Sequence, residues 1–80
     1  MLNKQRIRVM IVEDEPTFQE LVQLVLSLDP QFQVVRIVGT GEEALEEFAE
    51  ASPDLILLDF RLPGIDGLET AKRIKELRPD

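Results

Sequence analysis

Apolar and polar positions alternate in blocks along the chain, and the spacing inside each block differs from the next. Residues 7–12 are almost wholly apolar and β-branched, which is typical of a strand buried on both faces. A polar break with Pro16 follows, and apolar residues then recur every three or four positions until Asp29 and Pro30. This spacing predicts an amphipathic helix, and Pro16 suits its first turn because proline has no N–H to donate.

The same scheme of a strand followed by a helix occurs a second time. Residues 34–38 predict a strand, and a glycine-rich turn follows them. Thr40 with Glu43 three residues later forms a capping-box pattern, which indicates the start of a helix. The acidic run over residues 42–50 is typical of the solvated face of that helix.

A third unit completes the chain. Residues 54–60 predict a strand, residues 62–67 a loop, and the pair Asp66 and Glu69 the start of a helix. The inner side of this helix is predicted to carry Leu68, Ala71, Ile74 and Leu77. The order βαβαβα predicts an α/β fold with a parallel sheet, right-handed crossovers and helices on both faces.

Carboxylates follow two of the predicted strands. In such sheets ligands bind beyond the carboxyl ends of the strands, where Glu13, Asp14 and Asp59 stand. If the first and third strands are neighbours, the three side chains converge, and a hard divalent cation such as Mg²⁺ would offset their mutual repulsion. The alternative is that acidic residues cap the next helix, which is the interpretation preferred for Glu15. Asp59 is harder to explain in that way, because it follows four apolar residues of a strand.

Composition narrows the classes of protein that fit. The 80 residues carry nine Lys and Arg against sixteen Asp and Glu, a net charge of −7, with no His and no Cys. These counts exclude disulfide scaffolds, Cys/His zinc sites and Cys or His nucleophiles. The acidic balance argues against a general nucleic-acid binder, and no apolar run is long enough to span a bilayer. We therefore expect a cytoplasmic chain without a membrane partner.

Two segments carry a family resemblance. Residues 12–16, Val-Glu-Asp-Glu-Pro, and residues 54–69, which run from Asp-Leu-Ile-Leu-Leu-Asp-Phe to Gly-Leu-Glu, resemble the receiver domain of bacterial two-component response regulators. The resemblance covers essentially the whole chain. It implies a flavodoxin-like doubly wound parallel sheet, here truncated to βαβαβα with strand order 2-1-3, and assigns residues 1–80 to one partial receiver domain.

The resemblance also implies roles for single residues. Asp59 would be the phosphoacceptor, modified by a histidine kinase or a phosphotransfer protein. Glu13, Asp14 and Asp59, with the main-chain carbonyl of Arg61, would bind Mg²⁺. Glu13 stands where the commonest receiver sequence has Asp, so its longer side chain would bind metal through water or at an altered angle. The domain would be no enzyme beyond metal-assisted phosphorylation and dephosphorylation of itself.

Receivers continue through two further βα units that supply a Thr or Ser, a Lys and a switchable aromatic residue. None of these has a counterpart in the 80 residues, so we expect phosphorylation of this chain to be weak and switching to be lost. Nucleic acid would be contacted only through an output domain that is absent here.

Two other functions compete with the receiver. Residues 39–44 fit the pattern G-x-G-x-x-A of a dinucleotide-binding turn, and Asp59 follows at 20 residues from Gly39. However, Glu42 and Glu43 place two negative charges where a pyrophosphate would sit. The second alternative is a structural half of a flavodoxin-like domain, which would form a homo-oligomer through the exposed Leu55–Phe60 edge.

Overall fold

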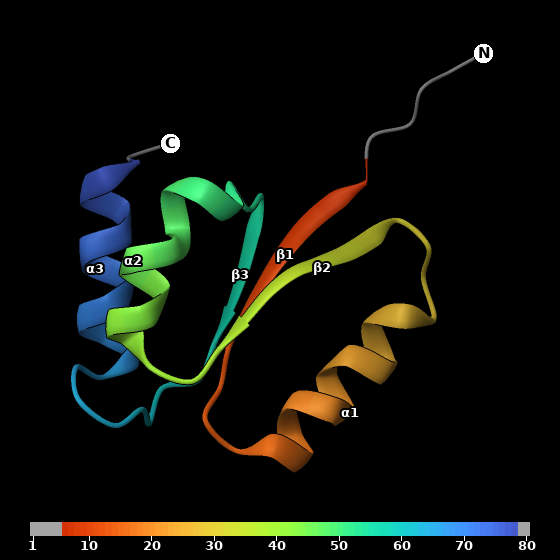
Figure 1. The fold of residues 1–80 in the computed structure, drawn as a ribbon, viewed down its shortest axis with the longest axis horizontal. Coiled ribbons are helices and arrows are strands. Elements are labelled where there is room, and N and C mark those ends of the chain that lie inside the picture. The colour runs from red at the N-terminus through yellow and green to blue at the C-terminus, as the bar shows by residue number, and fades with distance from the viewer. Residues whose placement is uncertain (1–5, 79–80) are drawn as a thin grey trace.

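A computed structural model describes residues 6–78 as a three-stranded parallel sheet with three helices. The strand order is β2-β1-β3, with α1 on one face of the sheet and α2 and α3 together on the other (Figure 1). The elements, in chain order, are β1 Ile7–Val12, α1 Pro16–Ser27, β2 Phe32–Val38, α2 Gly41–Ala51, β3 Leu55–Leu58 and α3 Gly67–Leu77. The fold class and the strand order predicted above are confirmed.

The three strands end at the same level, which determines where the loops that follow them meet. Val12 at the end of β1 lies opposite Val38 of β2 and Leu58 of β3. The strand predicted over residues 54–60 is shorter in the structure, because pairing with β1 ends at Leu58. Asp59 therefore lies just beyond the strand, where its carboxylate reaches the sheet edge instead of the apolar face.

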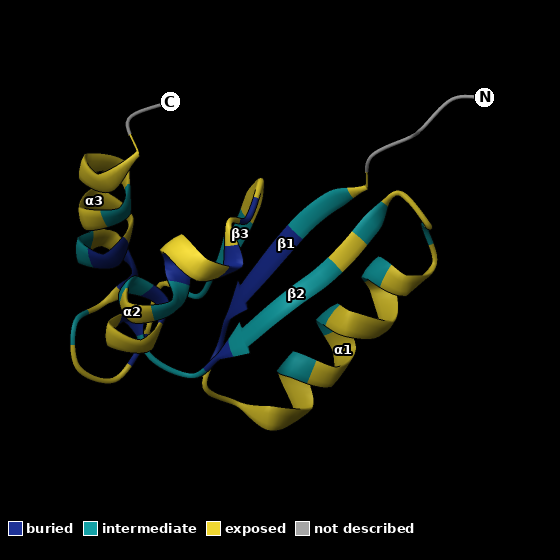
Figure 2. Ribbon diagram, turned by 45° about the horizontal axis from the view of Figure 1, so that its top comes forward, coloured by how far each residue is buried: buried dark blue, intermediate teal, exposed yellow. Residues whose placement is uncertain are grey.

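The core lies between the sheet and α2. β1 is buried along most of its length, as its apolar sequence predicts, and Figure 2 shows it as the most deeply buried element. The buried cluster consists of Met10, Val12, Val38, Ala44, Ala51 and Leu62. Since side chains alternate along a strand, Val9 and Ile11 point to the opposite face, on the side of α1.

The apolar stripe of α1 is mostly exposed. No residue of this helix is buried, and Phe18, Leu21, Leu24 and Val25 each expose half or more of their surface. The helix lies along β2 at one side of the sheet, so only part of its apolar face has a neighbour (Figure 1). Periodicity correctly predicted the helix but not how much of its stripe would be covered.

The inner side of α3 differs from the prediction. Leu68, Ala71 and Leu77 are exposed, whereas Thr70 is completely buried. The physical reason is that α3 packs chiefly against α2, which lies beside it. The face that α3 turns to its neighbour is therefore rotated toward Thr70, which fits against Gly41 at the start of α2.

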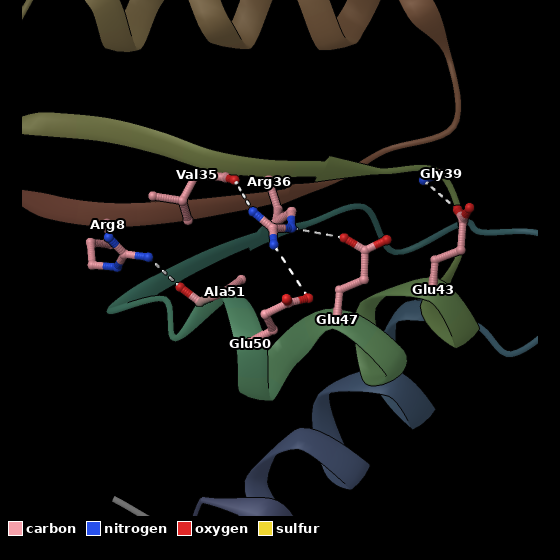
Figure 3. A network of polar contacts seen from close by, with 8 residues as sticks. All are labelled: Arg8, Val35, Arg36, Gly39, Glu43, Glu47, Glu50 and Ala51. Atoms are coloured by element: carbon pink, nitrogen blue, oxygen red, sulfur yellow. Dashed lines mark hydrogen bonds and ion pairs between the residues drawn. The ribbon is translucent and has the colours of Figure 1, made fainter.

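The acidic face of α2 is partly paired with β2. The Nε of Arg36 lies 2.9 Å from a carboxylate oxygen of Glu47, and its Nη2 lies 3.6 Å from one of Glu50 (Figure 3). Arg8 on β1 donates to the main-chain oxygen of Ala51, the last residue of the same helix. Glu50 remains largely exposed, as predicted for a solvated face, whereas Glu47 is only partly exposed because its carboxylate pairs with Arg36 from the strand before the helix.

Within residues 6–78, none of the helices combines the length and the apolar character needed to cross a membrane.

Candidate functional site

The loops that follow β1 and β3 bring three carboxylates together. One oxygen from each of Glu13, Asp14 and Asp59 lies within 4.8 Å of the others. The main chain holds them there, because Glu13 donates its N–H to the oxygen of Val38 at 2.9 Å and Asp59 donates its N–H to the oxygen of Val12 at 3.0 Å. The hydrogen-bond pattern of the sheet therefore continues into the site and fixes the main chain at Glu13 and at Asp59.

Glu13 is the buried member of the cluster. Its side chain is 7% exposed, and its carboxylate accepts the N–H of Glu15 at 3.1 Å. Burial raises the pKa of the Glu13 carboxyl above its usual value, and the negative charges of Asp59, Asp14 and Glu15 act in the same direction. The hydrogen bond from Glu15 opposes this rise without cancelling it. A positive charge in the cluster would stabilise the ionised form of Glu13.

Asp59 opens the loop that joins β3 to α3, and the loop folds back on it. One Asp59 carboxylate oxygen accepts the N–H of Arg61 at 3.2 Å. The loop closes when Gly67 donates its N–H to the oxygen of Phe60 at 3.1 Å. A Cβ at position 67 would lie 2.4 Å from the main-chain oxygen of Asp59, so this close approach requires glycine. Arg61, the predicted carbonyl ligand, lies exposed in this loop.

The donor set of the cluster fits a hard divalent cation. All three groups offer carboxylate oxygens, which Mg²⁺ and Ca²⁺ prefer, and no sulfur or nitrogen ligand is among them. Asp14 is exposed and Asp59 is half-buried, so the cluster is open to solvent on one side. Mg²⁺ keeps several waters when it binds, and a partly open site with one buried ligand can accommodate them.

The other acidic residues near the site cap helices. Glu15 is the N-cap of α1 and accepts the N–H of Phe18 at 2.8 Å, as the preferred interpretation predicted. Asp66 is the N-cap of α3 and accepts the N–H of Glu69 at 2.9 Å, as its pattern predicted. These two carboxylates have a structural role at helix ends.

The glycine-rich turn after β2 serves the start of α2. Thr40 accepts the N–H of Glu43 at 3.0 Å. The carboxylate of Glu43 accepts the N–H of Gly39 at 2.9 Å, as Figure 3 shows. This is the capping arrangement that the sequence predicted. Two N–H groups of this turn, those of Gly39 and Glu43, are thus bonded within the turn, and the carboxylate of Glu43 lies where a pyrophosphate would bind, so the geometry gives no support to a dinucleotide site.

Two residues that contact the site loops were missed by sequence reasoning. Gln19 on α1 donates its side-chain N–H to the main-chain oxygen of Glu13. Glu42 on α2 accepts the N–H of Ile65, which lies 23 residues further along the chain. No local pattern signals either contact, because each depends on how a helix packs beside a loop from another part of the sequence.

Comparison with known proteins identifies the family. Residues 9–80 match the response regulator receiver domain. Since this match covers nearly all of the chain, the protein belongs to the receiver domain family, whose members act in two-component signalling.

Relatives with this domain include enzymes and transcription regulators. A protein-glutamate methylesterase/protein-glutamine glutaminase of Syntrophus aciditrophicus is 49% identical over 73 residues, which are 91% of this chain and 21% of that protein. The transcriptional regulatory protein DegU of Brevibacillus brevis is 33% identical over 79 residues, 99% of this chain and 34% of its own length. The chain thus spans only about a fifth to a third of the length of these relatives.

Solved receiver domains have the same fold. The receiver domain of NarL from Mycobacterium tuberculosis superposes with a TM-score of 0.86 at 37% identity, over 91% of this chain and 59% of that one. The response regulator domain of CheB from Thermotoga maritima gives a TM-score of 0.88 at 31% identity, over 94% of this chain and 56% of the other. The chain therefore spans somewhat more than half of these receiver structures.

Proposed function

We propose that this chain is a phosphoacceptor module in which Asp59 receives a phosphoryl group from a phosphohistidine. The donor would be a histidine kinase or a phosphotransfer protein. The observation that supports this most strongly is the convergence of Glu13, Asp14 and Asp59 within 4.8 Å at the carboxyl edge of the sheet. A cluster of like charges is costly unless a cation compensates it, and a cation bound there can also contact phosphoryl oxygens.

The reaction moves one phosphoryl group between two side chains. A carboxylate oxygen of Asp59 forms a bond to phosphorus while the bond from phosphorus to the imidazole nitrogen breaks, and the bond's electron pair stays on that nitrogen. The product is an acyl phosphate on Asp59. This chain carries the acceptor, and it would catalyse no reaction other than its own modification.

Asp59 has one carboxylate oxygen engaged by the N–H of Arg61, which fixes the orientation of the group and directs the other oxygen away from that bond. Glu13, Asp14 and Asp59, with the main-chain carbonyl of Arg61, would hold Mg²⁺. When bound, Mg²⁺ supplies positive charge that offsets the charge on phosphoryl oxygens.

The proposal is tested with a small phosphodonor. Acetyl phosphate with Mg²⁺, followed by borohydride reduction and mass spectrometry of peptides, should place the modification on Asp59. The wild-type chain should give this modified peptide, because it carries the acceptor and the cation ligands. Omission of Mg²⁺ should abolish the product.

Two variants make this test specific. Asp59→Asn should give no modified peptide. Asp29→Asn is the matched control, because Asp29 accepts the N–H of Gln31 at 2.9 Å in the same local geometry but follows α1 instead of a strand. Modification that survives in Asp59→Asn, or that is absent from the wild-type chain, would contradict the proposed function.

A second proposal concerns association of two copies. We propose that the outer edge of β3 forms a two-fold homodimer contact. Among the described residues β3 pairs only with β1, and Leu55 at its start and Phe60 in the loop just beyond its end are 38% and 70% exposed. A groove beside this edge is lined by Ile56, Leu58, Ala71 and Ile74. Its rim carries both Asp54 and Lys75, which a two-fold axis can place opposite each other.

Sedimentation velocity over a range of concentrations measures this association. We expect Leu55→Lys to shift the dimer to monomer, and Leu24→Lys on the exposed side of α1 to leave it unchanged. A wild-type monomer at all concentrations, or a dimer disrupted by Leu24→Lys alone, would refute the β3 edge as the interface.

A further inference from the structure

The loop that joins β3 to α3 is held by the first turn of α2. The carboxylate of Glu42 accepts the N–H of Ile65 at 3.2 Å, across 23 residues of sequence. Gly41, the preceding residue, packs against Ile65 and Thr70 so closely that a Cβ there would lie 2.8 Å from the Ile65 side chain. Two consecutive residues of α2 therefore contact the far half of the loop that begins at Asp59.

The loop backbone is shaped to receive the Glu42 carboxylate. Gly64 has φ +75°, a left-handed conformation that favours glycine. A Cβ at this position would lie 2.5 Å and 2.7 Å from the two carboxylate oxygens of Glu42. The carboxylate thus occupies the space that a side chain at position 64 would need, next to the N–H that it binds.

A simpler explanation accounts for only part of this arrangement. An acidic residue in the first turn of a helix is stabilised by the helix dipole wherever its side chain points. Glu43, the next residue, binds Gly39 and Thr40 at the start of its own helix. Glu42 instead reaches out of α2 to a main-chain N–H of a different loop, and the dipole gives no reason for that contact.

The same loop carries the groups assigned to the phosphoacceptor site. Its first residue is Asp59, and Arg61 binds the Asp59 carboxylate through its N–H. Gly67 closes the loop onto Phe60 at the other end. Between these bonds, residues 62–65 have no strand or helix of their own to fix them, and Glu42 supplies a hydrogen bond from outside.

We propose that Glu42 is a positioning residue for the phosphoacceptor site: it holds Gly64 and Ile65 so that the Arg61 backbone stays in place beside Asp59. This inference rests on the proposed function, since it assigns Arg61 and Asp59 to a cation and phosphoryl site. Glu42 acts through the loop and contacts neither the cation nor the phosphoryl group.

The test compares three variants of α2. Glu42→Ala removes the acceptor, whereas Glu42→Gln keeps one acceptor oxygen, replaces the other oxygen by an NH₂ group and loses the charge. Glu46→Ala is the matched control, because Glu46 lies one turn further along α2 and its side chain makes no hydrogen bond or ion pair among residues 6–78. Circular dichroism of each variant establishes that the fold is retained.

Two readouts are measured by NMR. In the metal-free protein, Glu42→Ala should speed amide hydrogen exchange of Ile65 by about tenfold, the effect of losing one hydrogen bond. In a Mg²⁺ titration, the same variant should bind about tenfold more weakly, as typically occurs when a supporting residue outside the ligand set is lost. Glu42→Gln should stay within about threefold of the wild type in both, because it restores the acceptor, and Glu46→Ala should match the wild type.

Each of the other possible outcomes contradicts one specific part of the proposal. Faster exchange of Ile65 with unchanged Mg²⁺ affinity would show that Glu42 holds the loop without positioning the site. Equal weakening by Glu42→Ala, Glu42→Gln and Glu46→Ala would show an effect of net charge alone. A wild-type protein that binds no Mg²⁺ would overturn the proposed function itself, and the exchange data distinguish this from failure of the Glu42 contact.

Discussion

Glu13 and Asp14 are adjacent in the sequence but lie in different environments. Asp14 is exposed, whereas Glu13 is buried and bonded to the backbone of Glu15. Glu13 has one methylene more than the Asp that is commonest at this position in receivers. Because Glu13 is buried, this methylene is covered, and the Glu13 carboxylate reaches the same cluster as Asp14 and Asp59. At the scale of the residue, the site thus combines one buried carboxylate with two more accessible ones.

The raised pKa of Glu13 makes a prediction about stability. Because the folded-state pKa lies above the unfolded value, the native state binds the proton more tightly, and stability falls as pH rises between the two values. Glu13→Gln should therefore stabilise the metal-free protein at neutral pH, and this gain should shrink as pH is lowered toward the ordinary carboxyl pKa. Urea unfolding at several pH values measures it.

Glu20→Gln is the control for this prediction, because Glu20 lies exposed on α1. The effect of Glu20→Gln on the free energy of unfolding should show no comparable dependence on pH. A destabilising effect of Glu13→Gln at neutral pH without metal would contradict the assignment of Glu13 as a buried, destabilised carboxylate.

The elements differ in how much of each could be predicted from the sequence. β1 was predicted with its observed bounds, because a short apolar run rich in β-branched residues and followed by a polar break favours a strand buried on both faces. The helix caps at Thr40 and Asp66 were also predicted, because each cap is a hydrogen bond between a side chain and the N–H only three residues further along the sequence. The buried face of α3 was not predicted, because it depends on the neighbouring helix α2.

The contrast between β1 and α1 can be measured. Met10 in β1 is completely buried, and Met10→Ala should cost about 2–5 kcal/mol of unfolding free energy because it leaves a cavity. Leu24 in α1 is 61% exposed, and Leu24→Ala should change stability by less than about 0.5 kcal/mol. Urea denaturation followed by circular dichroism measures both. A loss at Leu24 as large as that at Met10 would show that the exposed side of α1 is covered in solution.

At the scale of the whole molecule, the order of the strands determines which residues meet at the carboxylate site. The order β2-β1-β3 places the end of β1 beside the end of β3, so Glu13, Asp14 and Asp59 meet although 45 residues of sequence separate Asp14 from Asp59. The residues of the cluster were named from the sequence, because strand ends and family motifs both point to them. The hydrogen bonds that Gln19 and Glu42 make to the loops of the site were not predicted from the sequence, because they form only when helices pack against these loops.

The central claim is that these three carboxylates form one divalent-cation site, and calorimetric titration with Mg²⁺ at neutral pH tests it most directly. The wild-type chain and Asp29→Asn should bind one Mg²⁺ with equal affinity. Asp14→Asn and Asp59→Asn should each weaken binding by about tenfold or more, because each removes an oxygen ligand. Binding that is unchanged in both variants, or absent from the wild-type chain, would contradict the account.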